Sequence, residues 1–482
     1  MKLSTLSRTK VCAAISVAFC TLPAFAQVEA KLTGRVHYDV RAISNGLTSS
    51  TDRDTASVAD NFEMRRARIG FQGSFNKQIQ FEGVANAVGG TTNIIDTAFI
   101  NYGYNPQGQI RVGRFKQPFS LEENTSSNNI DFMERSYVNQ MVPAKKLGAM
   151  IHGATDNGFT YGASLYQNDF SEVSNSSSVG AMGALRATVN LAKLANMGGD
   201  NTVVHLGAGY VKGSYQVTPT TSGNTADDPS KTTRATILSF RDENRGLSNA
   251  YLLQIGGDRI STAAYGASAD NVATIEQTMP GFEIAVAQGP FKFQGEYANS
   301  KFDATATKCA WAVKVCTSNG TATLNAQATA KYISALWNIT GENFASTYSK
   351  GAWGGIKPST EFMKDYGGVV GNGIGAWQLA YRYSEYAVSV NQTASYVPGS
   401  TNSPEYQLAD GSSANVNSRY QNSPKATTNT FGLNWILSSN ARVMFDYSET
   451  KFGSAVKTLD TNNNSSTTTT EKIFSVRTQV AF

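Results

Sequence analysis

The segment from Phe474 to Phe482, with the sequence FSVRTQVAF, decides the fold class. Its apolar and polar side chains alternate, so that one face of an extended chain carries Phe474, Val476, Thr478, Val480 and Phe482. A period of two is typical of a β-strand whose two faces meet different surroundings. The segment therefore predicts a strand.

Four further segments of the chain alternate in the same way. They are Arg66–Phe75, Leu185–Leu191, Trp377–Tyr383 and Val443–Tyr447. Segments of about ten residues are long enough to cross a membrane as tilted strands. Their polar faces carry arginine and glutamine in mid-strand, which a water-filled lumen accepts and a packed core does not.

The connections between such segments are of two kinds. Asn105–Gly108 and Leu437–Asn440 have the composition of tight turns, whereas residues 213–233, 388–427 and 455–471 are long and polar. Short turns on one side and long loops on the other, with tyrosines near the segment ends, are typical of an outer-membrane barrel. We therefore expect an all-β fold, a transmembrane antiparallel β-barrel with long extracellular loops.

The composition of the 482 residues agrees with this expectation. Charged residues make up 16% of the chain, against roughly 25% in soluble domains. Hydrophobic residues reach only 40%, too few for a bundle of membrane helices. A large secreted β protein and an outer-membrane β-barrel remain as the two classes that fit. Three of the 41 lysines and arginines lie in residues 1–26, so residues 27–482 carry a formal net charge of +2. This balance predicts no partner, so any electrostatic function must depend on a local arrangement of charge.

The N-terminal residues 1–26 have the features of a secretory signal peptide. Basic residues precede the apolar stretch Val11–Leu22, and Ala24–Ala26 forms an A-x-A cleavage site. We expect export, with the barrel formed by residues 27–482.

Few side chains suit a disulfide, a metal site or catalysis. In an exported chain, Cys309 and Cys316 are candidates for a disulfide that closes a small loop. The histidines are His37, His152 and His205, on different segments, and no G-x-S-x-G or H-E-x-x-H motif occurs. We predict no metal site, and we rank a barrel hydrolase or an adhesin below a channel.

Basic residues cluster early in the chain. Arg65, Arg66 and Arg68 begin one strand, and Arg111, Arg114 and Lys116 follow. Arg66 and Arg68 share the polar face of their strand, with Asp96 as the main nearby acid, so two guanidinium groups on one lumen wall could hold a permeating anion. The alternative is that the basic residues are solvated charges at the rim or partners of lipopolysaccharide phosphates.

The chain resembles the phosphate-selective porin O/P family of bacterial outer membranes. The resemblance extends over nearly the whole chain and is carried by LTGRVHYDV (32–40), RRARIGFQG (65–73), IIDTAFINY (94–102), VGRFKQPFSLEENTSSNNIDFMERS (112–136), VVHLGAGY (203–210), GPFKFQGEY (289–297), ITGENF (339–344), GGIKPS (354–359), GAWQLAYRYS (375–384) and FGLNWILSSNARVMFDYS (431–448). It implies a barrel of 16 strands and a homotrimer. It further implies one pore per subunit, narrowed by at least one loop that folds inward.

The resemblance also implies a set of pore residues. Arg35, Arg65 and Arg66 match arginines at the constriction of phosphate-selective members, and Asp96 matches the acid among them. Ser126 and Ser127 match the loop serines whose hydroxyl groups bind the anion in those members.

The pore sequence departs from the family at two positions. Glu123 stands where those members have a lysine, and Arg68 stands where they have a tyrosine. A carboxylate in place of an ammonium changes the constriction by two charges, and Arg68 restores at most one. Lys116 completes the set of candidate pore residues.

The predicted function is a passive outer-membrane channel for small anions, with phosphate or related oxyanions as the substrate class. We expect no catalysis, no cofactor and no nucleic-acid partner. Outer-membrane lipid and lipopolysaccharide are expected to surround the barrel. The alternative is a general or weakly selective porin of the same fold, in which the basic residues only shape the electric field.

Overall fold

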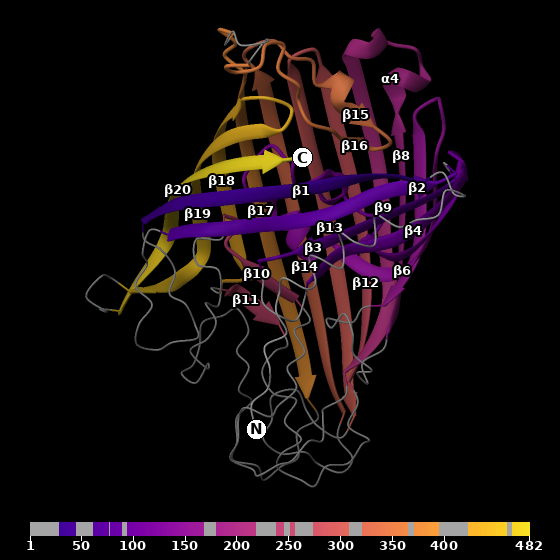
Figure 1. The fold of residues 1–482 in the computed structure, drawn as a ribbon. Helices are drawn as coiled ribbons and strands as arrows, with labels where there is room; N and C mark the ends of the chain where they lie inside the picture. The colour runs from indigo at the N-terminus through magenta and orange to yellow at the C-terminus, as the bar shows by residue number, and fades with distance from the viewer. Residues whose placement is uncertain are drawn as a thin grey trace, which may run out of the picture.

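The fold is a closed antiparallel β-barrel of 16 strands (Figure 1). The computed structural model describes residues 28–44, 61–76, 78–88, 94–167, 180–217, 238–244, 251–255, 273–307, 321–364, 371–394, 423–459 and 465–482. The candidate signal peptide 1–26 and both candidate disulfide cysteines, Cys309 and Cys316, lie outside the described residues.

Each barrel strand pairs with the next barrel strand along the chain, and β20 pairs with β1 to close the cylinder. The strands are β1 (Val28–Ser44), β2 (Asn61–Phe75), β3 (Ile79–Asn86), β4 (Ile95–Asn105), β5 (Gly108–Lys116), β6 (Lys145–Ala154), β7 (Phe159–Gln167), β8 (Ala181–Asn190), β9 (Thr202–Val217), β12 (Ala273–Gln288), β13 (Phe291–Thr307), β14 (Thr321–Asn338), β17 (Ala376–Ala394), β18 (Lys425–Ile436), β19 (Ala441–Leu459) and β20 (Ser465–Ala481).

The remaining elements are short and lie between barrel strands. They are α2 (Leu121–Asn124), α3 (Tyr137–Met141), α4 (Leu191–Leu194), η1 (Gly199–Asn201), η3 (Ala345–Thr347) and the two hairpins β10 (Leu238–Arg241) with β11 (Tyr251–Ile255) and β15 (Tyr348–Ser349) with β16 (Ala352–Trp353). None of the helices in the described part of the chain is long and apolar enough to cross a membrane.

The predicted strands are confirmed, with corrections at their ends. Leu191 was predicted as part of a strand but begins α4. The predicted loop 455–471 is largely strand, because β19 continues to Leu459 and β20 begins at Ser465. Serine and threonine fill most of that stretch, so no apolar alternation marked the strands in the sequence.

The outer and inner faces of the barrel are reversed relative to a soluble protein. Apolar side chains on the outer face are open to the surroundings, and Leu165, Ile333 and Phe431 expose 70%, 64% and 57% of their surface. The inner face holds buried polar groups such as Arg382 and Arg477. This arrangement places the apolar face against lipid and the polar face around the lumen.

Two segments lie inside the barrel, and a third reaches into it from the end with the short turns. Residues 117–144, called here the inner loop, connect β5 to β6 and contact inward-facing side chains of β2, β13, β17 and β20. Residues 238–244, the second inner segment, include β10 and pack against β17 and the inner loop. Residues 339–364, the turn-side segment, follow β14 and contact β8 and β9.

Small residues on the wall make room for the inner loop. Alanines 326, 328 and 330 of β14 are buried where α3 packs against that strand. Phe119 fits over Gly209 of β9 and Gly281 of β12, where an added Cβ atom would come within 2.7 and 2.3 Å of the ring. The wall at this level is therefore shaped to hold one particular loop.

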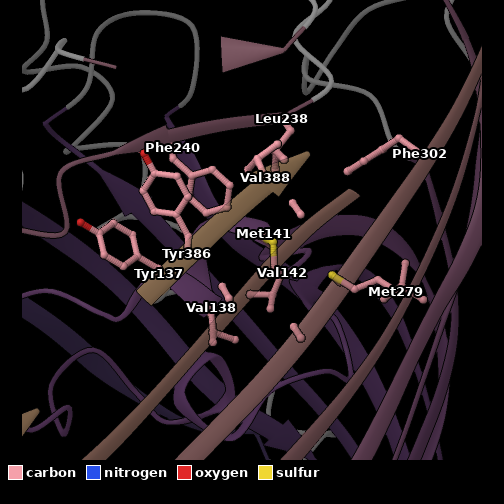
Figure 2. Close-up of a cluster of buried hydrophobic side chains, with 14 of the residues drawn as sticks. Tyr137, Val138, Met141, Val142, Leu238, Phe240, Met279, Phe302, Tyr386 and Val388 are labelled. Carbon is pink, nitrogen blue, oxygen red and sulfur yellow. The ribbon is translucent and has the colours of Figure 1, made fainter. Parts of the chain in front are cut away.

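Aromatic packing holds the second inner segment. The Phe240 ring stacks on Tyr386 of β17 with a centroid distance of 4.0 Å and an interplanar angle of 2°. Tyr137 of the inner loop meets Tyr386 edge-on at 4.9 Å. Figure 2 shows the three rings beside Val138, Met141 and Val142 of the inner loop. One apolar cluster therefore joins both inner segments to the wall.

We predict that Phe240→Ala releases the second inner segment without unfolding the barrel. Truncating a buried Phe costs about 3–5 kcal/mol, while the strand ladder is untouched. Trypsin should cut after Arg241 at least tenfold faster than in the parent. The matched control is Phe431→Ala on the outer face. Unchanged cleavage in Phe240→Ala, or equal acceleration in the control, would contradict this account.

Candidate functional site

One cavity of about 1000 Å³ lies in the lumen between the wall and the inner segments. All nine predicted pore residues line it, namely Arg35, Arg65, Arg66, Arg68, Asp96, Lys116, Glu123, Ser126 and Ser127. Among the described lining residues, twelve are lysine or arginine and five are aspartate or glutamate. Cations therefore dominate the cavity wall by number, and their pairing decides which charges an ion meets.

A β-bulge brings Arg65 into the lumen. The register of β1 against β2 pairs His37 with Arg66 and then Tyr38 with Met64, so Arg65 is an extra residue on β2. Strict alternation would turn Arg65 toward lipid, whereas the bulge turns Arg65 and Arg66 to the same side. The alternation in the sequence could not show this, because a bulge leaves no break in composition.

Arg65 is neutralised by the inner loop. Its guanidinium donates from Nε to Glu134 Oε1 at 2.7 Å and from Nη2 to Oε2 at 3.0 Å. Arg477 of β20 donates to the same carboxylate at 2.9 Å and to Asp39 of β1. Burial raises the pKa of Glu134, but Arg65 and Arg477 outweigh burial and hold that pKa well below its usual value. Arg65 is thus an anchor for the inner loop.

Arg68 is neutralised by the wall itself. Its Nη2 lies 2.8 Å from Asp96 Oδ1, and Lys145 of β6 donates to Asp96 Oδ2. One carboxylate is shared by two cations, which leaves one net positive charge in this group. Arg68 therefore does not simply replace the charge that is lost at Glu123.

Glu123 is held by cations rather than facing the cavity as a free carboxylate. Arg135 Nη1 lies 3.5 Å from its Oε2, Lys116 Nζ lies 4.0 Å from its Oε1, and Asn139 donates to it at 2.7 Å. Burial alone would raise the pKa of Glu123, yet Arg135 and Lys116 lower it. Lys116 also donates to the carbonyl oxygens of Glu123 and Thr125, so it fixes the turn around α2.

Among the five predicted cationic pore residues, Arg35 and Arg66 have no carboxylate oxygen within 4.0 Å in the part of the chain that the structure describes, whereas Arg65, Arg68 and Lys116 do. Arg111, on the same cavity, also has no such partner and donates to Asn101. Arg35 Nη1 donates to Ser127 Oγ at 2.6 Å. Arg66 Nη1 lies 3.3 Å from His37 Nδ1, and His37 Nε2 lies 3.4 Å from Asn128 Oδ1. Ser126 accepts from the Asn128 backbone instead and shapes the turn.

Register places the two guanidinium groups near each other. Arg35 pairs with Arg68 and His37 pairs with Arg66, so Arg35 and Arg66 are diagonal neighbours on β1 and β2. Such neighbours have Cα atoms about 7–8 Å apart. Their long side chains can therefore reach the same small ion. The hydroxyl of Ser127, in the inner loop, lies beside them because it accepts a hydrogen bond from Arg35.

A second anchor joins both inner segments to β17. Arg382 lies 3.3 Å from Glu122 Oε1 of the inner loop through Nη1 and donates to Glu243 of the second inner segment through Nη2. Burial raises the pKa of Glu243 to about 7, although Arg382 opposes that rise. Both contacts are wholly buried.

The turn-side segment was not predicted to reach the lumen. Tyr348 bonds to His205 of β9 at 2.5 Å, and Arg186 of β8 donates to the Gly351 carbonyl at 2.8 Å. Lys350 from the same segment lines the cavity. The signal in the sequence was length, because residues 339–375 separate two strands on the side where the other connections are short.

The histidines do not form a catalytic set. His152 bonds to Asn101, and His205 lies between Tyr348 and Glu283. Nor does any group of three His, Cys, Asp or Glu side chains suited to a metal ion occur in the ranges that the structure describes.

The pKa of Glu243 predicts that the second inner segment docks more tightly as pH falls. A carboxyl whose pKa is about 7 when docked and near 4.5 when exposed takes up a proton on docking, so docking gains stability below pH 7. Tryptic cleavage after Arg241 should slow about tenfold between pH 8 and pH 6. Glu243→Gln corrects for the protease's own pH profile. Parallel profiles for parent and variant would refute the linkage.

We also predict that Glu123→Gln raises conductance in dilute salt. The amide keeps the contact with Asn139 but leaves Lys116 and Arg135 with an uncompensated charge, which attracts chloride. Single-channel conductance in 10–50 mM KCl should rise about twofold and converge with the parent above 1 M, where screening is strong. Glu449→Gln on the outer face is the control. A fall in dilute-salt conductance would contradict the pairing.

Comparisons with solved structures return outer-membrane proteins. OmpT of Vibrio cholerae matches at 10% identity and a TM-score of 0.47, over 96% of this chain and 99% of that one. The outer-membrane channel DcaP of Acinetobacter baumannii matches at 10% identity and 0.45, over 94% and 97%. An anion-selective porin from Comamonas acidovorans matches at 11% identity and 0.43, over 95% and 100%.

Sequence comparisons place the chain in a family. A search among curated proteins gave no match. The family model for phosphate-selective porin O and P matches residues 30–482, nearly the whole chain. The protein therefore belongs to the phosphate-selective porin O and P family and forms a diffusion channel in the bacterial outer membrane.

Proposed function

We propose that the channel passes small anions and binds oxyanions such as phosphate at Arg35 and Arg66. The observation that carries the proposal is the absence of a carboxylate partner for these two arginines among the described residues, while Arg65 and Arg68 are paired. Transport is passive, without catalysis or a cofactor. Membership of the family supports a homotrimer with one pore per subunit.

The chemistry of the two side chains favours a tetrahedral oxyanion. A guanidinium group offers paired N–H donors that match two oxygens of one phosphate. The Ser127 hydroxyl, already bonded to Arg35, is placed to supply a further contact. Two unit charges about 4 Å apart attract by roughly 4 kcal/mol at an effective dielectric near 20. This is enough to retain an anion briefly, while the open cavity allows it to leave.

Paired charges explain why the departures from the family pattern are tolerated. Glu123 lies among Lys116, Arg135 and Asn139, so its charge is largely compensated. Asp96 is compensated by Arg68 and Lys145. The anion-binding surface is then formed by Arg35 and Arg66, whichever residue stands at position 123.

The test is block of chloride current by phosphate across a planar bilayer. In Arg66→Ala the phosphate concentration for half block should rise at least tenfold, a loss of about 1.4 kcal/mol. Arg66→Lys keeps the charge without the paired donors and should give an intermediate value. Lys350→Ala, which changes a cation elsewhere on the same cavity, is the control and should stay within twofold. Equal block of the chloride current by phosphate in the parent and in Arg66→Ala would contradict the proposed site.

A further inference from the structure

Four lysines form a patch on the outer face of the barrel, away from the pore. This lysine patch consists of Lys331 of β14, Lys425 of β18, Lys451 of β19 and Lys472 of β20. Their side chains are 53%, 54%, 63% and 46% exposed. Their chain neighbours Tyr332, Ala426, Phe452 and Ile473 are buried on the inner side, so alternation turns the lysines outward.

The patch lies at the edge of the lipid-facing band. Registered pairs align Tyr381 with Phe431, Phe431 with Tyr447 and Tyr447 with Phe474, which makes one aromatic row across β17 to β20. Such a row is typical of the membrane interface.

The charged side chains follow the aromatic row toward the ends of the strands. Two positions beyond the row stand Glu449 and Lys472, four positions beyond it stand Lys331, Glu385 and Lys451, and six positions beyond it stands Lys425. At about 3.3 Å per residue, these positions lie some 7–20 Å beyond the aromatic row. The short turn 437–440 and the residues 339–375 are at the opposite ends of these strands. In an outer-membrane barrel the short turns are periplasmic, so the patch lies at the outer leaflet.

The lysine charges are only partly compensated. Glu385 lies 3.4 Å from Lys331 and 3.6 Å from Lys425. Glu449 lies 4.0 Å from both Lys451 and Lys472. Each carboxylate is shared by two ammonium groups, so each of the two triads keeps one positive charge. The triads are two strands apart, because Glu385 pairs with Thr427 and Thr427 pairs with Lys451.

We propose that the lysine patch binds the phosphorylated headgroup of lipid A, the membrane anchor of lipopolysaccharide. Two positive centres about 10 Å apart, from two strand spacings, match a headgroup with more than one phosphate. The aromatic row beside them receives the acyl chains. Lysine stems lie along the apolar surface while their ammonium groups reach the headgroup level. The same charge complementarity draws basic residues to anionic headgroups at other membrane surfaces.

The experiment measures binding of bisphosphorylated lipid A to the purified full-length barrel in detergent. The variant carries Lys331→Gln, Lys425→Gln, Lys451→Gln and Lys472→Gln together. The control carries Lys193→Gln and Lys357→Gln, which change exposed lysines at the opposite end of the barrel. Heat-modified mobility on gels and single-channel conductance verify that each chain is folded.

We expect the quadruple variant to bind lipid A at least tenfold more weakly, with the control within twofold of the parent. Parent protein should bind dephosphorylated lipid A, or phosphatidylglycerol, as weakly as the quadruple variant binds lipid A. Equal binding of lipid A by parent and quadruple variant would overturn the proposal. So would equal binding of phosphorylated and dephosphorylated lipid A by the parent. Loss of the oligomer in the quadruple variant with lipid A binding intact would assign the patch to a subunit contact instead.

Discussion

Charge pairing inside the barrel is the constraint on which the remaining structure depends. Buried arginines of the wall, such as Arg382 and Arg477, are costly unless a carboxylate meets them. The inner loop supplies those carboxylates through Glu122 and Glu134. The wall therefore fixes where the loop lies, and the loop in turn fixes which cations stay unpaired. We propose that the unpaired cations, above all Arg35 and Arg66, give the pore its function.

The alternation of the sequence predicted the barrel because lipid and water impose opposite demands on neighbouring residues. Segments such as Trp377–Tyr383 carry that signal clearly, and they form strands. The Ser- and Thr-rich ends of β19 and β20 carry none, since those residues suit a solvated strand and a loop equally well. The strand number and the inward loop came from resemblance to a family, not from periodicity.

The sequence predicted which residues make up the candidate site, but not which of these charged side chains form ion pairs. All nine residues line one cavity, yet Arg65 and Arg68 are paired while Arg35 and Arg66 are not. The outcome depends on the bulge at Arg65 and on contacts between residues far apart in the chain, such as Arg65 with Glu134. Pairing of this kind is decided by the fold, so residue types alone could not distinguish an anchor from an ion-binding group.

We propose that the uncompensated arginines make this pore selective for anions. The most direct measurement is the zero-current potential of the parent channel in a planar bilayer that separates two KCl concentrations. We expect the potential to have the sign that belongs to preferential chloride flow down the gradient. A zero-current potential near zero, or one whose sign belongs to preferential potassium flow, would contradict anion selectivity.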